Sequence, residues 1–166
     1  MIKTIIWTVI FSIAAAVLQS TLLRYITLYR AVPDIALSIV VYSAYVDGTM
    51  TGQVAGFCSG IILDLISAAP LGLNALVRTL VGALTGLLKG TFFLNFFLPI
   101  LLCAAATLVK AACLFALHLL LGDAVPAYSL MEPTLWAELS LNAISAPFVF
   151  ALLKRFKPLR RERSRN

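Results

Sequence analysis

The sequence has little charge and few of the residue types on which most enzyme chemistry depends. Only 12% of its 166 residues are charged, whereas a soluble domain averages about 25% charged residues. The chain contains one histidine. A single histidine rules out a histidine-pair zinc site, and no stretch resembles a phosphate loop, a nucleotide-binding turn or a nucleophile with its base. We therefore expect a protein that is not an enzyme and that uses no metal ion or other cofactor.

Cysteine is also scarce. The three cysteines, Cys58, Cys103 and Cys113, all lie within apolar segments. No pair of them has the spacing of metal ligands, and thiols in apolar surroundings usually serve as small core residues. We interpret them as packing residues.

Apolar residues are abundant in place of these groups. They make up 61% of the chain, and the mean hydropathy is +1.00. Six apolar runs lie near residues 4–23, 34–46, 51–67, 72–88, 98–121 and 135–153. Because a membrane crossing needs about 20 apolar residues, and lipid offers no partner to an unpaired backbone group, these runs predict an all-α bundle of six transmembrane helices. We expect one domain, residues 1–153, and a basic tail, residues 154–166.

The charge distribution predicts how this bundle crosses the membrane. The net charge is +6, which in a soluble protein would suggest a nucleic-acid partner. Most of the basic residues follow the last apolar run, so we interpret them instead by the positive-inside rule, which places basic segments of membrane proteins in the cytoplasm. We therefore expect a cytoplasmic C-terminus, and six crossings return the N-terminus to the same side. Arg24 and Arg30 count against this orientation. The basic residues of the tail are Lys154, Arg155, Lys157, Arg160, Arg161, Arg163 and Arg165. The first run is interpreted as a retained helix rather than a cleaved signal peptide, since apolar residues continue to Leu23.

The third and fourth runs carry a repeated pattern of glycine. Residues recur every four positions as Gly52, Gly56, Gly60 and Asp64, and again as Arg78, Gly82, Gly86 and Gly90. Such spacing places each set on one face of a helix. The two sets mirror each other about position 71, so a helical hairpin would set glycine beside glycine and Asp64 beside Arg78. This predicted ion pair would relieve two intramembrane charges, and exchanging the two residues should partly restore a protein weakened by either substitution.

Two further charges fall near or within apolar runs. Asp34 follows Pro33 at the start of the second run, where helix capping alone would explain it. Lys110 lies near the midpoint of the fifth run, too deep for its side chain to reach the membrane surface. We expect it either to pair inside the bundle or to face a protein partner. Asn142 and Ser145 are its predicted polar neighbours.

His118 and Glu138 lie at comparable depths on the fifth and sixth runs. We expect a structural hydrogen bond between them rather than a proton relay. Asp64 and Glu138 would be the two carboxylates of an intramembrane hydrolase, but a level arginine makes Asp64 a poor general acid.

Two stretches resemble the rod shape-determining protein MreD family of bacteria: VPDIALSIVVYSAY at residues 32–45, and GQVAGFCSGIILDLISAAPLGLNALVRTLVG at residues 52–82. Chain length, six helices and a basic tail agree with this resemblance. It implies a subunit of the cell-elongation machinery in the inner membrane, which binds the single-span protein MreC and works with RodA and a class B penicillin-binding protein. It also implies a bundle similar to the substrate-binding S-components of energy-coupling-factor transporters.

Two hypotheses of function follow. In the first, the hairpin is the rigid part of a scaffold whose turn and neighbouring helices hold a partner's transmembrane helix, so Gly56→Leu or Gly60→Leu should abolish the complex. In the second, the chain is the vitamin-binding or other solute-binding subunit of a transporter, with a polar pocket around Lys110, Asn142 and Gln19. The choice between monomer and homodimer stays open. The candidate structural and partner-binding residues are Asp34, Gly52, Gly56, Gly60, Asp64, Pro70, Leu71, Gly72, Arg78, Gly82, Gly86 and Lys110.

Overall fold

The described part of the chain folds into a bundle of six helices. The computed structural model describes residues 2–21, 31–67, 70–91, 95–122, 125 and 132–156. The regular elements in these ranges are α1 (Ile2–Thr21), α2 (Ile35–Asp47), α3 (Thr49–Ile66), α4 (Leu73–Leu87), α5 (Phe97–Leu121) and α6 (Pro133–Arg155). The predicted all-α membrane architecture is confirmed, and each helix lies within a few residues of the apolar run that predicted it.

The helices differ in how they meet their surroundings. By length and composition, α1, α3, α5 and α6 are able to cross a membrane, whereas α2 and α4 are shorter. The 13 residues of α2 rise only about 20 Å, and every residue from 36 to 46 is buried. A helix that is apolar on all sides belongs in the interior of a bundle. Helix α2 is this central helix, since α1, α3, α4, α5 and α6 all contact it.

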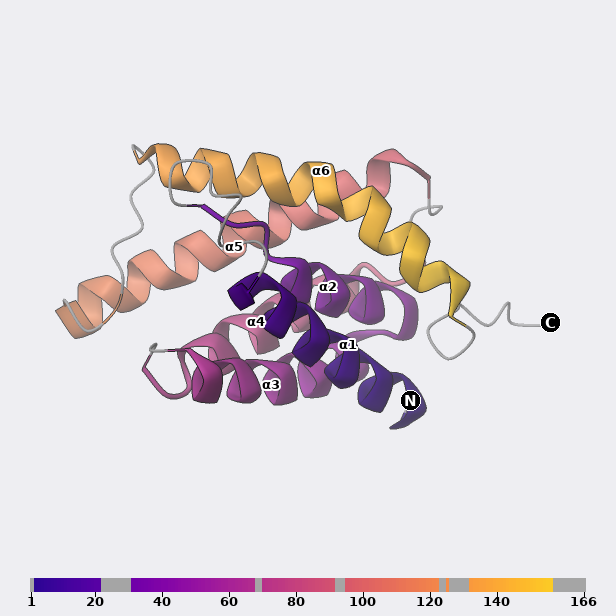
Figure 1. The fold of residues 1–166 in the computed structure, drawn as a ribbon, viewed down its shortest axis with the longest axis horizontal. Helices are drawn as coiled ribbons and strands as arrows, with labels where there is room; N and C mark the ends of the chain where they lie inside the picture. The colour runs from indigo at the N-terminus through magenta and orange to yellow at the C-terminus, as the bar shows by residue number, and fades with distance from the viewer. Residues whose placement is uncertain are drawn as a thin grey trace.

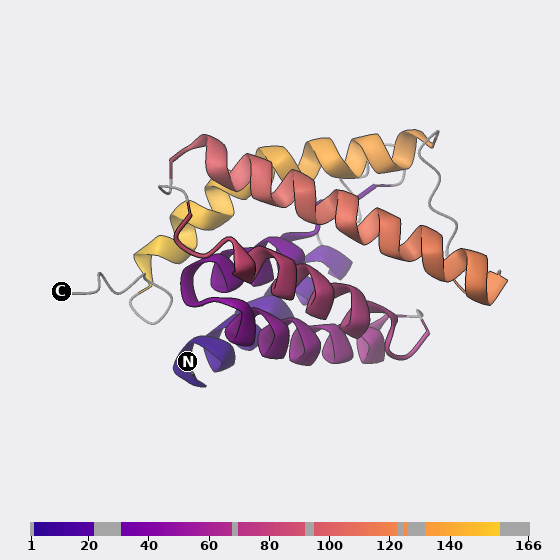
Figure 2. The ribbon, with the colours of Figure 1, turned by 180° about the vertical axis from the view of Figure 1, so that it is seen from behind.

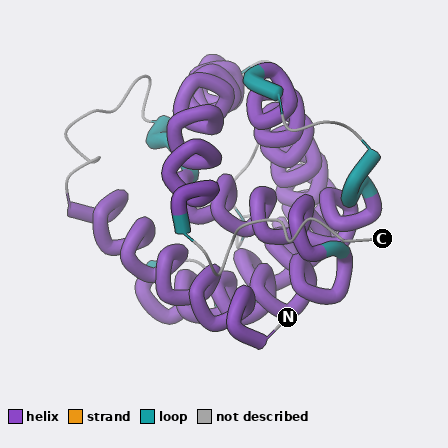
Figure 3. The backbone as a smooth tube through the Cα atoms, turned by 90° about the vertical axis from the view of Figure 1, so that its right-hand side faces the viewer, coloured by secondary structure: helices purple, strands orange, loops and turns teal. Residues whose placement is uncertain are grey.

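The bundle has two layers. Helices α5 and α6 pack on each other and cover one side of the group formed by α1, α2, α3 and α4 (Figure 1). An edge-to-face contact between the rings of Tyr42 on α2 and Phe150 on α6, with centroids 5.1 Å apart, joins the layers in the core. Figure 3 shows the backbone along the long axis, with the helices gathered into one bundle.

The helix ends divide into two sets. The start of α1 and the end of α6 lie at one end of the bundle (Figure 1), and the hairpin turn between α3 and α4 lies at the other (Figure 2). The start of α6 lies at the same end as the hairpin turn. This is the arrangement expected for an even number of crossings.

Glycine shapes two of the corners. Gly48, with a φ of 100°, is the only residue between α2 and α3, and Gly72, with a φ of 92°, precedes α4. Positive φ values are strained for residues with a Cβ atom. The first of these corners turns the chain sharply enough to lay α3 against α2.

Candidate functional site

The glycine rows of α3 and α4 face each other. A Cβ atom added at Gly52 would overlap the backbone of Gly82, and one at Gly56 would overlap the carbonyl oxygen of Arg78. A Cβ atom at Gly86 would likewise overlap the backbone of Thr49. The two helices therefore pack backbone to backbone, which is the close contact that small residues permit in lipid.

The register of this contact differs from the predicted mirror. Gly52 lies opposite Gly82 rather than Gly90, eight positions nearer the hairpin turn, and Gly60 lies opposite Ala75 rather than Gly82. Eight residues of helix rise about 12 Å. The sequence identified the faces correctly and their alignment wrongly, because a repeat of four residues is compatible with several registers.

Asp64 sets this register by capping α4. The carboxylate of Asp64, which is 3% exposed, accepts hydrogen bonds from the backbone N–H groups of Gly72 at 3.0 Å, Asn74 at 3.0 Å and Ala75 at 3.2 Å. The side-chain amide of Asn74 donates a fourth at 2.8 Å. A carboxylate at a helix N-terminus satisfies N–H groups that have no partner within the helix and interacts favourably with its dipole.

The predicted ion pair between Asp64 and Arg78 is therefore wrong. Arg78 instead donates from Nη2 to Oδ1 of Asp34 at 2.8 Å. Arg78 lies one turn beyond the N–H groups that Asp64 caps, on the face of α4 that contacts the start of α2. Asp34, its partner, lies outside the α3–α4 hairpin, so the spacing of residues within the hairpin could not predict this pair.

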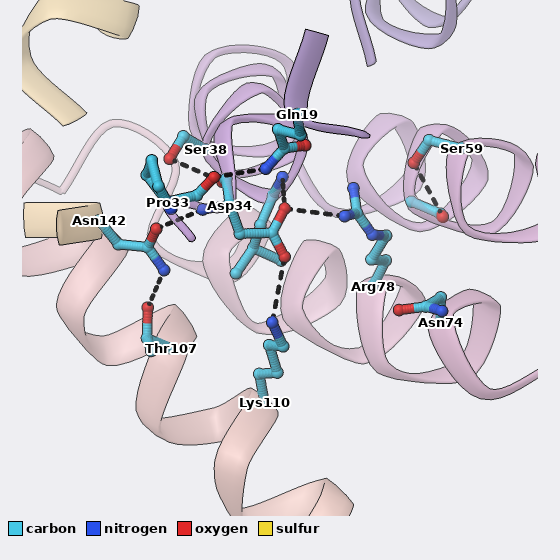
Figure 4. A network of polar contacts seen from close by, with 12 residues as sticks. Gln19, Pro33, Asp34, Ser38, Ser59, Asn74, Arg78, Thr107, Lys110 and Asn142 are labelled. Carbon is cyan, nitrogen blue, oxygen red and sulfur yellow. Dashed lines mark hydrogen bonds and ion pairs between the residues drawn. The ribbon is translucent and has the colours of Figure 1, made fainter. Parts of the chain in front are cut away.

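Asp34 is the centre of a network of four charges, of which Figure 4 shows Asp34, Arg78 and Lys110. Its Oδ1 also accepts from the backbone N–H of Leu37 at 2.9 Å, so it does cap α2 as predicted. Its Oδ2 lies 3.2 Å from Nζ of Lys110, and Nζ lies 2.5 Å from Oε1 of Glu138. Capping alone does not explain Asp34, because its carboxylate also forms ion pairs with both Arg78 and Lys110.

Lys110 is thus paired inside the bundle, which was one of the two predicted alternatives. Its partners are carboxylates rather than the predicted neighbours, Asn142 and Ser145. Asn142 accepts from the backbone N–H of Asp34 at 2.6 Å and donates to Thr107 at 2.9 Å. Ser145 donates to the carbonyl oxygen of Asn142 at 3.2 Å. Asn142 and Ser145 therefore form hydrogen bonds beside the charge network, and the carboxylates of Asp34 and Glu138 pair with the lysine.

The expected hydrogen bond between His118 and Glu138 is also wrong. The Nδ1 atom of His118 lies 2.8 Å from the carbonyl oxygen of Val125, whereas Glu138 pairs with Lys110. His118 ties the end of α5 to the chain that follows it, which is a structural role. The three cysteines are free thiols within apolar helices.

The hairpin turn presents an apolar side chain outward. The carbonyl oxygen of Pro70 accepts from the backbone N–H of Leu73 at 3.2 Å, and Leu71 between them is 76% exposed. A Cβ atom at Gly72 would meet nothing within 4 Å. The predicted turn residues Pro70, Leu71 and Gly72 therefore form an exposed tip next to the capped start of α4.

Two hollows adjoin these features. An apolar groove of about 480 Å³ runs between the outer faces of α3 and α4, and its walls include Gln53, Phe57 and Ala83. A polar cavity of about 450 Å³ lies among the helix ends near the turn, and Gln19 and Lys110 line it. Asn142, predicted to line such a pocket with them, is not among its lining residues.

The four-charge network is the main feature that sequence reasoning missed. A usable signal was present: besides Asp64, two cations, Arg78 and Lys110, and two carboxylates, Asp34 and Glu138, lie at most 17% exposed by side chain toward the same end of the bundle. Intramembrane charges of opposite sign predict pairing, because an unpaired charge there is costly. Matching each cation to its carboxylate required the packing of α2 against α4, α5 and α6.

A family model described as rod shape-determining protein MreD matches residues 1–156. No curated protein and no solved structure matches the chain.

Proposed function

The chain belongs to the MreD family of rod shape-determining membrane proteins, and from this membership we propose that it is a non-enzymatic scaffold subunit of the bacterial rod complex in the inner membrane. Its direct partner in this proposal is the transmembrane helix of MreC. Through MreC it supports peptidoglycan synthesis by RodA and a class B penicillin-binding protein. The action is one of holding and orienting other proteins.

The observation that carries the proposal is the outer face of the α3–α4 hairpin. The glycine rows are used up by contact between the two helices, so a partner must bind elsewhere on them. Opposite those rows lie large exposed apolar side chains, including Phe57 at 51%, Leu65 at 70% and Leu76 at 52% exposed. The groove of about 480 Å³ between the helices would receive side chains of a transmembrane helix lying along the hairpin.

Gln53 supports a protein rather than lipid as the occupant of this groove. It lines the groove, and within the described part of the chain its side-chain amide makes no hydrogen bond. An amide facing hydrocarbon without a partner costs free energy, whereas a polar group or exposed backbone carbonyl of a neighbouring helix would satisfy it. The exposed tip at Leu71 extends the same surface toward the end of the bundle.

The proposal is tested by filling the groove without disturbing the hairpin contact. Ala83 on α4 lines the groove and is half-buried, so Ala83→Trp should fill it and reduce co-purification with MreC at least tenfold. Ala104→Trp is the matched control, because Ala104 is half-buried in a separate apolar groove beside α5. Both variants should keep the thermal stability of the unchanged protein in detergent.

Normal recovery of MreC with a stably folded Ala83→Trp protein would contradict docking at this groove. Equal loss with Ala104→Trp would point to a contact that spans both layers of the bundle. Retained membership of the rod complex without any MreC would contradict the choice of MreC as the direct partner.

A further inference from the structure

The polar cavity near the hairpin turn is separate from the docking groove. It has a volume of about 450 Å³ and lies where α1 and α3 end and where α2, α4 and α6 begin. The polar side chains of its wall include Gln19, Asp34, Asn74, Arg78, Lys110 and Glu138. A volume of this size lies within the usual range of about 300–1,000 Å³ for small-molecule sites.

One group in this wall lacks a hydrogen-bond partner. Arg78 is 2% exposed, and its Nη2 donates to Asp34. Its other terminal nitrogen, Nη1, is buried and makes no hydrogen bond within the described residues. Figure 4 shows Nη1 pointing away from the bond to Asp34. A buried guanidinium nitrogen with two N–H donors and no acceptor is costly, so an oxygen atom placed beside it would stabilise the site.

The wall also offers acceptors. Gln19 uses its amide N–H to donate to the carbonyl oxygen of Pro33, and Asn74 uses its own to donate to Asp64. This leaves the amide oxygens of Gln19 and Asn74 as acceptors in the lining. A ligand that both accepts from Arg78 and donates to these oxygens would complement the cavity.

The charge of the wall decides the class of ligand. Asp34 and Glu138 compensate Arg78 and Lys110 within the salt-bridge network. An anion placed beside Arg78 would leave one uncompensated negative charge near two carboxylates, and a cation would leave one positive charge. Either is disfavoured beside the buried side chain of Arg78.

We propose that this cavity binds an uncharged polar group rich in hydroxyl or amide functions, with one of its oxygens accepting a hydrogen bond from Nη1 of Arg78. The group is either a free solute or the uncharged headgroup of a lipid. Arg78 then has two roles, since Nη2 holds Asp34 and Nη1 holds the ligand. The inference goes beyond the scaffold function and involves no transport step.

The test uses the full chain in phosphatidylcholine nanodiscs with defined probes. Saturable binding of radiolabelled glycerol, glucose and N-methylacetamide is measured for the free-solute source. Nanodiscs that also contain glucosyl-diacylglycerol, followed by native mass spectrometry of the released protein, cover the headgroup source. Radiolabelled inorganic phosphate is the anionic comparison. We expect at least one uncharged probe to bind once per protein, and phosphate to bind more weakly.

Two substitutions tie binding to the cavity. Arg78→Lys keeps the positive charge beside Asp34 but removes Nη1, and should weaken the bound probe at least about tenfold. Arg155→Lys is the matched control, because Arg155 is exposed at the opposite end of α6, and should leave binding unchanged. Should Arg78→Lys fail to fold, Gln19→Leu decides instead, since it removes an acceptor from the wall and should weaken the same probe.

The outcomes separate the two sources and the proposal from its failure. Binding of glucose alone assigns the cavity to a free solute, and retention of the glycolipid without binding of glucose assigns it to a headgroup. The proposal is overturned by the absence of binding in both arms, by tighter binding of phosphate than of every uncharged probe, or by unchanged affinity in folded Arg78→Lys and Gln19→Leu proteins. None of these results depends on MreC, so they leave the scaffold proposal to its own test.

Discussion

The carboxylates of Asp64 and Asp34 do different work in this protein, and their neighbours decide which. Asp64 accepts backbone and side-chain N–H groups at the start of α4, whereas Asp34 faces both Arg78 and Lys110. A buried ion pair is by itself weak support for stability, because desolvation offsets the attraction between the charges. Removing one member is different, since it leaves its partner charged and uncompensated.

A double-mutant cycle distinguishes these roles. We expect Asp34→Asn to lower the free energy of unfolding by about 3 kcal/mol or more, because two cations lose their shared carboxylate. Combining it with Arg78→Gln should reveal a coupling free energy of about 0.5–3 kcal/mol between the two sites. The stability losses of Asp64→Asn and Arg78→Gln should instead be additive to within about 0.5 kcal/mol. Denaturant unfolding in detergent micelles provides the measurement.

The control for this cycle is Asp47→Asn at the end of α2, where no salt bridge is formed within the described residues, and it should change stability little. A large coupling between Asp64 and Arg78 would restore the original pairing hypothesis and refute the geometry described above. Rescue of Asp64→Asn by an exchange of charges with Arg78 would have the same meaning.

At the scale of the helix, the α3–α4 hairpin depends on the absence of side chains. Lipid tails are as apolar as the helix surfaces, so helices associate in a membrane through van der Waals contact and hydrogen bonds rather than through the hydrophobic effect. The opposed glycines bring the two backbones into contact over several turns. The cap at Asp64 then prevents one helix from sliding along the other.

A single methyl group should therefore weaken the hairpin. Gly56→Ala places a Cβ atom against the carbonyl oxygen of Arg78, and overpacking of this kind costs about 1–3 kcal/mol. The better helix propensity of alanine offsets up to about 1 kcal/mol of this. We expect a net loss of about 1–2 kcal/mol, measured as a lower thermal midpoint in detergent. Ala104→Leu, which adds more volume on a half-buried surface of α5, should have little effect.

An unchanged or raised midpoint for Gly56→Ala would mean that the helices separate at little cost. The expectation that Gly56→Leu or Gly60→Leu abolishes complex formation stays a prediction. Its physical route is through the hairpin itself, because the glycines contact α4 or its start and leave the outer face to a partner.

For the whole molecule, the end of the bundle where α1 begins and α6 ends and the end that holds the hairpin turn are chemically distinct. Lys154 and Arg155 lie at the end of α6, and the exposed apolar tip at Leu71 lies at the opposite end. We propose that the end of the bundle where α1 begins and α6 ends faces the cytoplasm, by the positive-inside rule. The polar cavity then lies toward the outer surface of the membrane.

Cysteine labelling tests this orientation. In a chain whose native cysteines are replaced by alanine, Leu71→Cys should react with a membrane-impermeant maleimide added to spheroplasts. Thr91→Cys, exposed between α4 and α5 at the other end, should react only after the membrane is permeabilised. The reverse pattern would invert the topology and place the cavity toward the cytoplasm.

Local patterns in the sequence determined the elements of this protein. Apolar runs bounded by Pro33, Gly72 and charged residues defined six helices, because lipid forces the backbone to satisfy itself within each segment. The four-residue spacing of glycine defined the contact faces of α3 and α4, because i and i+4 share one side of a helix. The MreD resemblance, carried by the same stretches, was confirmed by the family match.

Only the tertiary structure decided which of these faces and charges meet. A period of four residues repeats along the helix, so it leaves the register of the hairpin open until Asp64 reaches the start of α4. The partners of Arg78 and Lys110 come from elements far away in the chain. The sequence around a charged residue does not indicate which opposite charge it will pair with. That choice depends on burial of α2 at the centre of the bundle, since this is what brings Asp34 between the two cations.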